Sequence, residues 1–214
     1  MQSAPSSSTQ PVATGRRSRK KSRTRTDLIE AGAALFHADG FDETTTSDIA
    51  ERADVSQRTL FRHFPTKEAL LFGDMDDLLL ELRDALAARP VDEAVLVSIR
   101  CAMISLSDNF ERNRERRLLQ FRLAATYPAV SGYTRAIIQA QWEREIIAAV
   151  AAKLNVDPMV DPRPEVVAGA TMSAVRIATR QWTAGNGTVD FVSLVVQALE
   201  VIGTFDRLER PPDA

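Results

Sequence analysis

Apolar residues recur at helical spacing through most of this 214-residue chain, and that pattern limits what the chain can fold into. Few breaks interrupt the runs, since only nine Gly and ten Pro occur. The alternation of apolar and polar residues that is typical of a half-buried strand is hardly seen. With 44% hydrophobic residues, the chain can bury a substantial core. We therefore expect an all-α protein of about nine helices.

The breaks between the runs predict the domain organisation. A Ser/Pro-rich stretch and a basic stretch make up residues 1–22, which we expect to be a disordered basic arm. A three-helix DNA-binding domain is expected over 23–68, followed by a longer helical domain over 69–214. The expected helices span 24–38, a short stretch from Thr45, 57–64, 67–88, 91–109, 112–126, 130–155, 164–184 and 188–207.

Local signals predict where the short helices begin. Thr45, with Asp48 three residues later, matches a capping box. Ser56 and Thr66 stand where they can cap the next two helices. Asp54 lies in the turn between the second and third helices, where a short polar side chain tolerates positive φ.

Positive charge is concentrated towards the N-terminus, although the net charge is only −2. Residues 1–67 hold 11 Lys and Arg against 8 Asp and Glu, whereas the remainder holds 16 against 21. Residues 16–25 are basic and contain no acid. A basic arm on an otherwise acidic chain indicates phosphate binding. A solubilising tail is the alternative interpretation.

The segment 45–66 has the order and spacing of a helix-turn-helix, in which the second helix projects into the major groove of DNA. Leu60 and Phe64 are four residues apart and would face the core, so the polar residues between them face outward. Arg pairs well with guanine and Gln with adenine, while Lys and His suit phosphates. The expected DNA contacts come from Arg25, Thr45, Gln57, Arg58, Thr59, Arg62, His63 and Lys67. The alternative is an ordinary solvated helix face.

Residues 25–71, which include "TDLIEAGAALFHADGFDETTTSDIAERADVSQRTLFRHFPTKEALL", resemble the TetR family of bacterial transcriptional regulators. The shared shape is a first helix ending in "F…GF", then "T…IA..A.VS..TLY.HF..KE.L". The resemblance implies base contacts around Gln57, Arg58 and Thr59, and phosphate contacts from Thr45, Thr46, His63 and Lys67. The family usually carries a phosphate-binding Tyr where this chain has Phe61. We expect that contact to be missing and Phe61 to serve mainly in packing.

The last two expected helices predict self-association. Residues 188–203 are apolar on nearly every side, and such a helix is buried on every side. The preceding helix is rich in small residues, which permit close approach of a partner helix. We expect a homodimer through these helices, because two recognition helices about 34 Å apart can then read a palindromic operator. A monomer with the last helix at its centre is the alternative.

Helices between residues 91 and 184 are expected to enclose a small-molecule effector. The candidate ligand-binding residues are Met103, Phe121, Tyr133, Trp142, Met172 and Arg176, with Arg117, Arg122 and Arg180 nearby. Arg176 could meet an anionic head group or form a salt bridge at the dimer interface. Residues 116–154 are similar to the C-terminal domain of the mycofactocin-cluster regulators. That similarity implies an acyl-CoA-type or another lipophilic effector.

Nothing in the sequence favours an enzyme, a metal site or a cofactor. The only His residues are His37 and His63, Cys101 lies on an apolar helix, and no Gly-rich phosphate loop occurs. No run is long and apolar enough to span a membrane, and a single Cys fits a reducing cytoplasm. We therefore expect a cytoplasmic, ligand-responsive repressor that binds a palindromic operator as a dimer. The alternative is an architectural protein that binds DNA without sequence preference.

Overall fold

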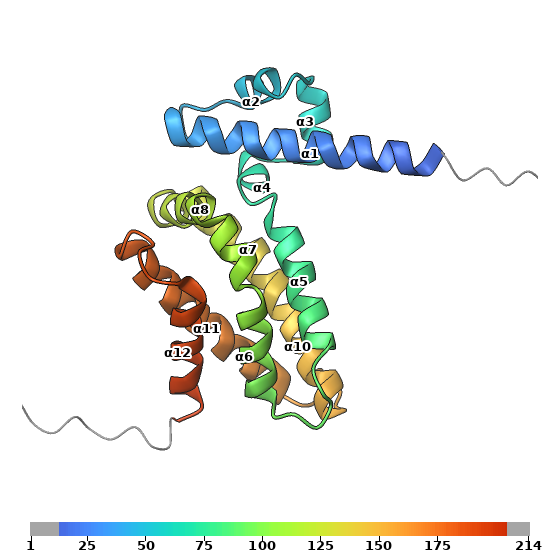
Figure 1. Ribbon diagram of the computed structural model, residues 1–214, viewed down its shortest axis with the longest axis vertical. Coiled ribbons are helices and arrows are strands. Elements are labelled where there is room, and N and C mark those ends of the chain that lie inside the picture. The colour runs from blue at the N-terminus through green and yellow to red at the C-terminus, as the bar shows by residue number, and fades with distance from the viewer. Residues whose placement is uncertain (1–12, 205–214) are drawn as a thin grey trace, which may run out of the picture. The chain divides into compact units, whose positions relative to one another are not determined.

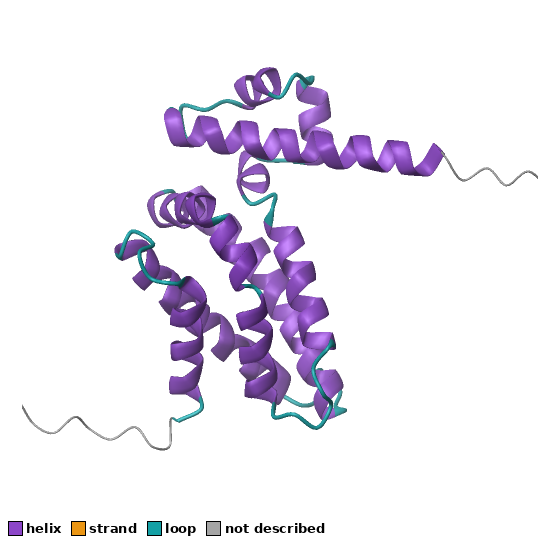
Figure 2. Ribbon diagram, in the orientation of Figure 1, coloured by secondary structure: helices purple, strands orange, loops and turns teal. Residues whose placement is uncertain are grey.

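The computed structural model describes residues 13–204, with side chains from Arg19 onward, and Figure 2 shows that every regular element in that range is a helix. The chain divides into two compact units, Met1–Gly73 and Asp74–Ala214, rather than after residue 68. The described part contains twelve α-helices and one π-helix, so the all-α prediction is confirmed. None of these helices is long and apolar enough to cross a membrane.

The first unit contains four helices (Figure 1). They are α1 (Ala13–Ala38), α2 (Thr46–Arg52), α3 (Gln57–His63) and α4 (Lys67–Leu71). The expected first helix was 24–38, but α1 begins at Ala13. The prediction of a disordered arm is therefore wrong for residues 13–22, which continue α1. Residues 1–12 lie outside the described range.

Side chains cap the three short helices as the sequence predicts. The Thr45 hydroxyl accepts a hydrogen bond from Asp48 N at 3.2 Å, and the Asp48 carboxylate accepts one from Thr45 N at 3.0 Å. Ser56 and Thr66 cap α3 and α4 through the same contact to the third following residue. Asp54 has φ of 52°, in the left-handed region, as expected for the turn between α2 and α3. These contacts satisfy backbone N–H groups that a helix start leaves without partners.

Apolar side chains from α1, α2 and α3 meet in one small core. Leu28, Ile49 and Leu60 are fully buried, and Phe64 is almost so. Because α3 buries only this side, its remaining side chains are left on the surface. The core therefore presents α3 as a short helix with one open face.

The expected single helix over 67–88 is wrong, because α4 ends at Leu71 and α5 (Met75–Ala87) follows a turn. Gly73 lies in this turn. A Cβ at Gly73 would lie 2.8 Å from the Phe64 ring and 2.9 Å from Ile29, closer than real Cβ contacts. The turn therefore packs closely on the core of the first unit. A residue with a side chain at position 73 would clash with Phe64 and Ile29.

The second unit is a bundle in which α10 packs on α5 and α11, while α12 packs on α11 and α6 (Figure 1). After α5, its helices are α6 (Val95–Ser105), α7 (Ser107–Arg112), α8 (Arg114–Thr126), α9 (Pro128–Tyr133), the π-helix η1 (Thr134–Gln139), α10 (Ala140–Leu154), α11 (Arg163–Ala184) and α12 (Phe191–Ile202). Two predictions need correction: the helix expected over 91–109 starts at Val95 and breaks at Leu106, and the one expected over 130–155 contains η1. Residues 205–207 of the expected last helix lie outside the described range.

Four aromatic side chains from α7, α8, α11 and α12 hold these helices together. The rings of Phe110 and Phe191 are stacked, with centroids 4.1 Å apart. The Trp182 ring meets Phe110, Phe121 and Phe191 edge-on at 5.6–5.9 Å. The indole N–H of Trp182 donates to the carbonyl of Val189 at 2.7 Å, so its one polar atom is satisfied. Aromatic pairs at these distances stabilise packing beyond the area they bury.

Candidate functional site

The open face of α3 carries four exposed side chains. They are Gln57, Arg58, Phe61 and Arg62, whereas Leu60 points to the core. Thr59 is half-buried, and its hydroxyl lies 3.1 Å from that of the cap residue Ser56. The polar side chains expected to read DNA are therefore on the surface, at the beginning and along one side of a capped helix. Arg and Gln in this setting can form paired hydrogen bonds with base edges.

Phe61 does not have the packing role that we expected. Its side chain is 48% exposed, which makes it the large apolar residue on the open face of α3. The physical reason is its register: it lies one turn after Gln57 and shares the outward direction of that residue. Leu60 and Phe64 already fill the core. An exposed Phe ring on such a helix can contact a thymine methyl group.

Thr45 and Thr46 differ in whether they have a hydrogen-bond donor available for a DNA phosphate. The Thr45 hydroxyl donates to the Asp48 carboxylate at 2.7 Å, and the Thr45 N–H donates to the same group. Both donors of Thr45 are thus used inside the capping box. Thr46 occupies the first position of α2, where a helix leaves its backbone N–H without an intrahelical partner. The geometry therefore favours Thr46 as the phosphate donor of this pair.

Lys67 holds the loop between α1 and α2. Its ammonium donates to the carbonyl of Phe41, donates to the carbonyl of Thr44 at 3.1 Å, and lies 4.3 Å from the centre of the Phe41 ring. An ammonium has three N–H donors, so a donor remains for a phosphate. The phosphate contact stays a prediction, and a loop-holding role is added to it.

His63 and Arg25 lie at the end of α3 that faces α1. The Arg25 guanidinium lies 4.9 Å from the centre of the Phe64 ring, a cation–π contact. Burial, followed by the positive charges of Arg62, Lys21 and Arg25, lowers the pKa of His63 below its usual 6.5. At neutral pH, His63 can therefore offer a phosphate a neutral N–H rather than a positive charge.

A cavity of about 580 Å³ lies inside the second unit. Its apolar part is lined by Met75, Leu78, Met103, Leu106, Phe110, Phe121, Trp142, Met172, Phe191 and Val195. Sites of this size with apolar walls and a few polar groups are typical of small-molecule binding. Among the described residues, no group of three or more His, Cys, Asp or Glu side chains is placed to hold a metal ion.

Cationic and neutral polar side chains also line this cavity. The cations are Arg135, Arg176 and Arg180, none of which has an ion-pair partner among residues 13–204. The neutral polar groups are Ser131, Thr134, Gln139, Thr179 and Thr183. The lining is thus mainly apolar, and the three exposed arginines add positive charge to it.

Five of the six residues that we expected to contact a ligand line this cavity. They are Met103, Phe121, Trp142, Met172 and Arg176. Tyr133 does not line it: Ser131 of α9 and Thr134 of η1 face the cavity, and the Tyr133 side chain points in a different direction from both. Ligand contact by the other five remains a prediction.

Sequence reasoning missed Arg135 and gave Arg180 too little weight. Arg180 lies one turn after Arg176 on α11, so helical spacing could have found it. Arg135 lies four residues after Ser131 and seven before Trp142, which both line the cavity, so the same spacing could have found it. Arg122 does not line the cavity and instead donates to Asn186 Oδ1 at 2.8 Å.

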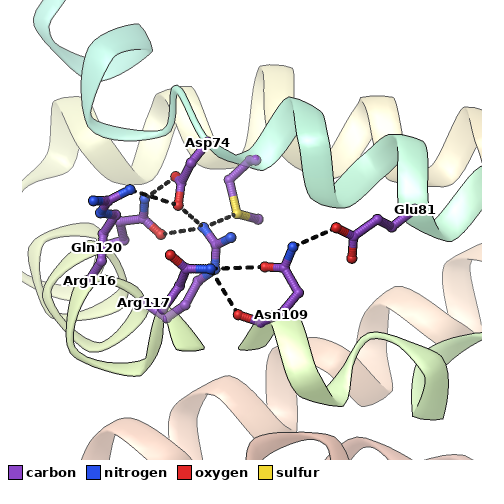
Figure 3. Close-up of polar contacts among 8 residues, drawn as sticks. Asp74, Glu81, Asn109, Arg116, Arg117 and Gln120 are labelled. Atoms are coloured by element: carbon purple, nitrogen blue, oxygen red, sulfur yellow. Dashed lines mark hydrogen bonds and ion pairs between the residues drawn. The ribbon is translucent and has the colours of Figure 1, made fainter. Parts of the chain in front are cut away.

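Arg117 is buried beside the cavity rather than lining it. Its Nη1 lies 2.9 Å from Asp74 Oδ2, 3.0 Å from Gln120 Oε1 and 2.9 Å from Met75 Sδ (Figure 3). Gln120 Nε2 also donates to Asp74 Oδ1 at 2.8 Å. Burial lowers the pKa of Arg117, and the nearby Asp74 opposes that shift. The network joins α8 to Asp74, the first residue of the second unit.

The outer side of α11 and α12 is exposed and partly apolar. Val166 is 65% exposed on α11, and Val201 is 46% exposed on α12. Gly169 and Ser173 follow Val166 at spacings of three and four residues and are also exposed. A Cβ at Gly169 would meet nothing within 4 Å, so another helix could approach closely there. Arg176 continues this stripe, which leaves both of its expected roles open.

Comparison with known families assigns both parts of the chain. A family described as bacterial regulatory proteins, tetR family, matches residues 28–73. A family described as the MftR C-terminal domain matches residues 93–205, more than half of the chain. The two matches cover the helix-turn-helix and the cavity-bearing bundle.

Individual relatives align over most of their length. The chain is 27% identical to the mycofactocin biosynthesis transcriptional regulator MftR of Mycobacterium tuberculosis, over 90% of this chain and 96% of that protein. It is 30% identical to the HTH-type transcriptional regulator TcmR of Streptomyces glaucescens, over 83% of this chain and 81% of that protein.

Solved structures share the fold. FadR of Thermus thermophilus, a TetR-family repressor in complex with lauroyl-CoA, has a TM-score of 0.57 at 22% identity, covering 89% of this chain and 98% of that one. FadR of Bacillus subtilis in complex with stearoyl-CoA has a TM-score of 0.59 at 13% identity, covering 83% and 96%. At this identity the likeness establishes the helical fold.

Proposed function

The chain belongs to the TetR family of bacterial regulatory proteins, and from this we propose that it is a ligand-responsive repressor of transcription. The observation that carries the proposal is the exposed face of α3, where Gln57, Arg58 and Arg62 stand on a capped helix-turn-helix. It acts on DNA in the cytoplasm, with α3 in the major groove. Gln57 and Arg58 read base edges near the start of α3, and Arg62 reaches the groove or its wall one turn later.

Contacts to DNA phosphates fix the position of α3 in the major groove. Thr46 donates from the start of α2, Lys67 from beside the loop that precedes α2, and His63 from the end of α3. These contacts supply affinity without sequence preference, and each charged one adds to the salt dependence of binding.

The repressor acts as a homodimer that packs through α11 and α12. The exposed stripe of Val166, Gly169 and Ser173, together with Val201, supports this, because small residues allow helices of two subunits to approach closely. A two-fold axis then gives two copies of α3 and a palindromic operator.

The effector is an acyl-CoA or another lipophilic compound bound in the 580 Å³ cavity. Two features support an anionic amphiphile: the apolar wall suits a chain of methylene groups, and Arg135, Arg176 and Arg180 suit a phosphate or carboxylate. The fatty-acyl-CoA complexes of the FadR structures agree with this choice.

Release from DNA follows from differential affinity. The effector binds more tightly to a dimer whose two copies of α3 are too far apart for the operator, and it therefore draws the population away from DNA. Coupling of this kind changes affinity by about 5- to 150-fold.

A gel-shift on the promoter DNA flanking its own gene, with and without lauroyl-CoA, tests the proposal. We expect one protected palindrome in a footprint and release by lauroyl-CoA. Protection of the DNA along its whole length would contradict a specific repressor and indicate an architectural protein that binds without sequence preference. If binding is specific but no acyl-CoA or other lipophilic compound reverses it, the effector assignment is wrong and the DNA-binding proposal stands.

A further inference from the structure

The cavity of the second unit has a buried end and an exposed end. The side chains that line it from α5 and α6 are all buried: Met75, Leu78 and Met103. The exposed side chains of its lining come from η1, α11 and the end of α8, and they include Arg135, Arg176 and Arg180. An amphiphile whose anionic head group binds these arginines therefore extends its chain towards α5 and α6.

Met75 lies between this buried end and a buried ion pair. It lines the cavity, and its Sδ lies 2.9 Å from Nη1 of Arg117. The same Nη1 lies 2.9 Å from Oδ2 of Asp74 (Figure 3). A methionine side chain is unbranched and has three rotatable bonds, so it moves readily within a packed core. A ligand chain that ends against Met75 thus changes a direct contact of Arg117.

The ion pair of Arg117 and Asp74 is incompletely supported by hydrogen bonds. Only 1% of the Arg117 side chain is exposed, and its buried Nε has no hydrogen-bond partner among the described residues. A buried ion pair repays the cost of its desolvation only if its geometry is good and its other polar atoms are hydrogen-bonded. A small displacement of Arg117 is therefore sufficient to weaken the pair.

Asp74 also has the position of a helix cap that it does not use. It precedes α5 as the N-cap residue, but its ψ is −5° and its side chain accepts no hydrogen bond from the start of α5. Asp190, the N-cap of α12, has ψ of 123° and accepts a hydrogen bond from Ser193 N at 2.7 Å. Asp is among the residues preferred for this role. An Asp74 released from Arg117 can therefore adopt the extended conformation and cap α5.

The conformation of Asp74 determines how the chain joins the two units. Asp74 is the first residue of the second unit and follows Gly73 directly. Gly73 packs closely on Phe64 and Ile29 in the core of the first unit. Rotation about ψ of Asp74 turns the chain at this junction, so the paired and the capping conformations attach the first unit in different directions.

We propose that Met75, Arg117 and Asp74 form a sensor of ligand length. A ligand chain that reaches Met75 displaces Arg117, frees Asp74 to cap α5 and weakens DNA binding. A shorter chain binds in the same cavity and leaves DNA binding unchanged. Met75 and Arg117 are thus positioning residues that act through Asp74. The inference rests on the proposed function, namely release from DNA by an acyl-CoA in this cavity.

A series of saturated acyl-CoAs from butanoyl to palmitoyl, in steps of two carbons, tests the sensor in the full chain. Calorimetry gives the Kd of each acyl-CoA, and anisotropy gives the Kd for the promoter DNA with and without saturating acyl-CoA. Affinity for the acyl-CoA should rise steadily, by about fourfold per methylene group. The Kd for DNA should change by less than about twofold below a threshold length, at or below lauroyl, and rise about 5- to 150-fold above it. A gradual rise with length would overturn the proposal.

Met75→Ala and Met172→Ala are a matched pair of variants. Both side chains line the cavity and are 8% exposed, but Met75 contacts Arg117 whereas Met172 lies on α11. Met75→Ala should move the threshold to longer chains by at least one step of the series, because a longer ligand is then needed to reach Arg117. Met172→Ala should keep the threshold, as should Met75→Leu, which preserves the volume. Equal shifts in the two alanine variants would overturn the proposal, since the total volume and not Met75 would then set the threshold.

A double variant tests the switch at Asp74. Arg117→Met/Asp74→Asn removes the ion pair but keeps a residue that can cap α5. Without ligand it should bind DNA about 5- to 150-fold more weakly than the wild type, and lauroyl-CoA should then change its Kd for DNA by less than about twofold. Calorimetry should still show lauroyl-CoA binding. Wild-type affinity for DNA together with normal release would overturn the proposal.

The outcome is separable from the proposed function. A wild-type chain that binds DNA and is released by no acyl-CoA would remove both the effector assignment and the sensor. Release by every acyl-CoA that binds, including the shortest, would remove the sensor alone. Thermal unfolding of each variant is recorded, and the threshold in the wild type is measured without any substitution.

Discussion

The Arg117 guanidinium lies 2.9 Å from the carboxylate of Asp74, and only 1% and 13% of these side chains are exposed. This ion pair ties α8 to the first residue after the DNA-binding unit (Figure 3). It also adjoins the cavity, since Arg117 contacts Met75 and lies 5.8 Å from the ring centre of Phe110, and both of those side chains line the cavity. The ion pair thus connects the first residue of the second unit to side chains that line the cavity.

Removing one partner of this pair should be costly. Arg117→Ala removes the closer and more buried of the two arginines that pair with Asp74, leaves only Arg116 Nη1 at 3.6 Å, and should lower the free energy of unfolding by about 3 kcal/mol, measured by urea denaturation. Arg117→Met combined with Asp74→Asn removes both charges and should recover most of the loss. Equal stability of the single and double variants would contradict a paired role. Arg83→Gln, at the exposed ion pair with Asp84, is the control and should change stability little.

Phe61→Tyr should strengthen DNA binding. The ring is 48% exposed on the open face of α3, and an added hydroxyl supplies the phosphate contact that the resemblance to TetR regulators implies is missing. One such hydrogen bond is worth about 1 kcal/mol, or roughly a fivefold lower Kd. Anisotropy titration on operator DNA measures it. Phe61→Leu serves as the control, and a tyrosine variant that binds no better than it does would refute the explanation.

Thr45 and Thr46 should respond differently to substitution. Thr45→Ala removes a capping box and should cost about 1 kcal/mol of unfolding free energy. Thr46→Pro removes the first backbone N–H of α2 at a position where proline is tolerated, so it should weaken DNA binding with little loss of stability. Thermal unfolding and anisotropy, applied to both variants, separate the two roles. Equal effects on DNA binding would contradict the assignment to Thr46.

His63 should make folding less favourable in mild acid. Its pKa is lowered in the folded chain by burial and by Arg62, Lys21 and Arg25. As pH falls below about 6.5, the unfolded chain takes up the proton first, so the stability contributed at neutral pH is lost. Urea unfolding at pH 7.5 and pH 5.5 should show a larger loss for the wild type than for His63→Gln. The same loss in both proteins would exclude His63 as the source.

Arg176 and Arg180 should affect the affinity for charged ligands only. Each Arg→Met substitution removes a cation from the cavity wall and should weaken lauroyl-CoA binding about tenfold in calorimetry, a change of about 1.4 kcal/mol. Dodecanol, which has the chain without the anionic head, should bind all three proteins alike. A parallel loss of dodecanol affinity would indicate damage to the cavity. Gel filtration checks whether Arg176 serves the dimer interface instead.

Local features of the fold were predictable because their causes are local. Thr45, Ser56 and Thr66 act on backbone groups three residues away, and Asp54 adopts positive φ within its own turn. The exposure of Gln57 and Arg58 followed from helical register in the same way. Such effects operate within one turn of chain, so a sequence pattern is sufficient to find them.

Longer-range features were not predictable in this way. The turn at Gly73 depends on Phe64 and Ile29 from other helices, and nothing in 67–88 marks it as a break except that glycine. Arg135 lines the cavity from the π-helix η1, an element that apolar periodicity does not predict. Arg117 had the spacing of a cavity residue, yet a partner 43 positions away, Asp74, holds it in the core.

By itself, the sequence determined the all-α class, the capped helix-turn-helix and the residues that α3 exposes, because hydrogen bonds within a turn and apolar periodicity decide these. Only the tertiary structure decided that Asp74 holds Arg117 in the core and that Arg135, Arg176 and Arg180 line the same cavity. The physical reason is that burial and charge pairing depend on which helices meet, and these contacts join residues far apart in the chain.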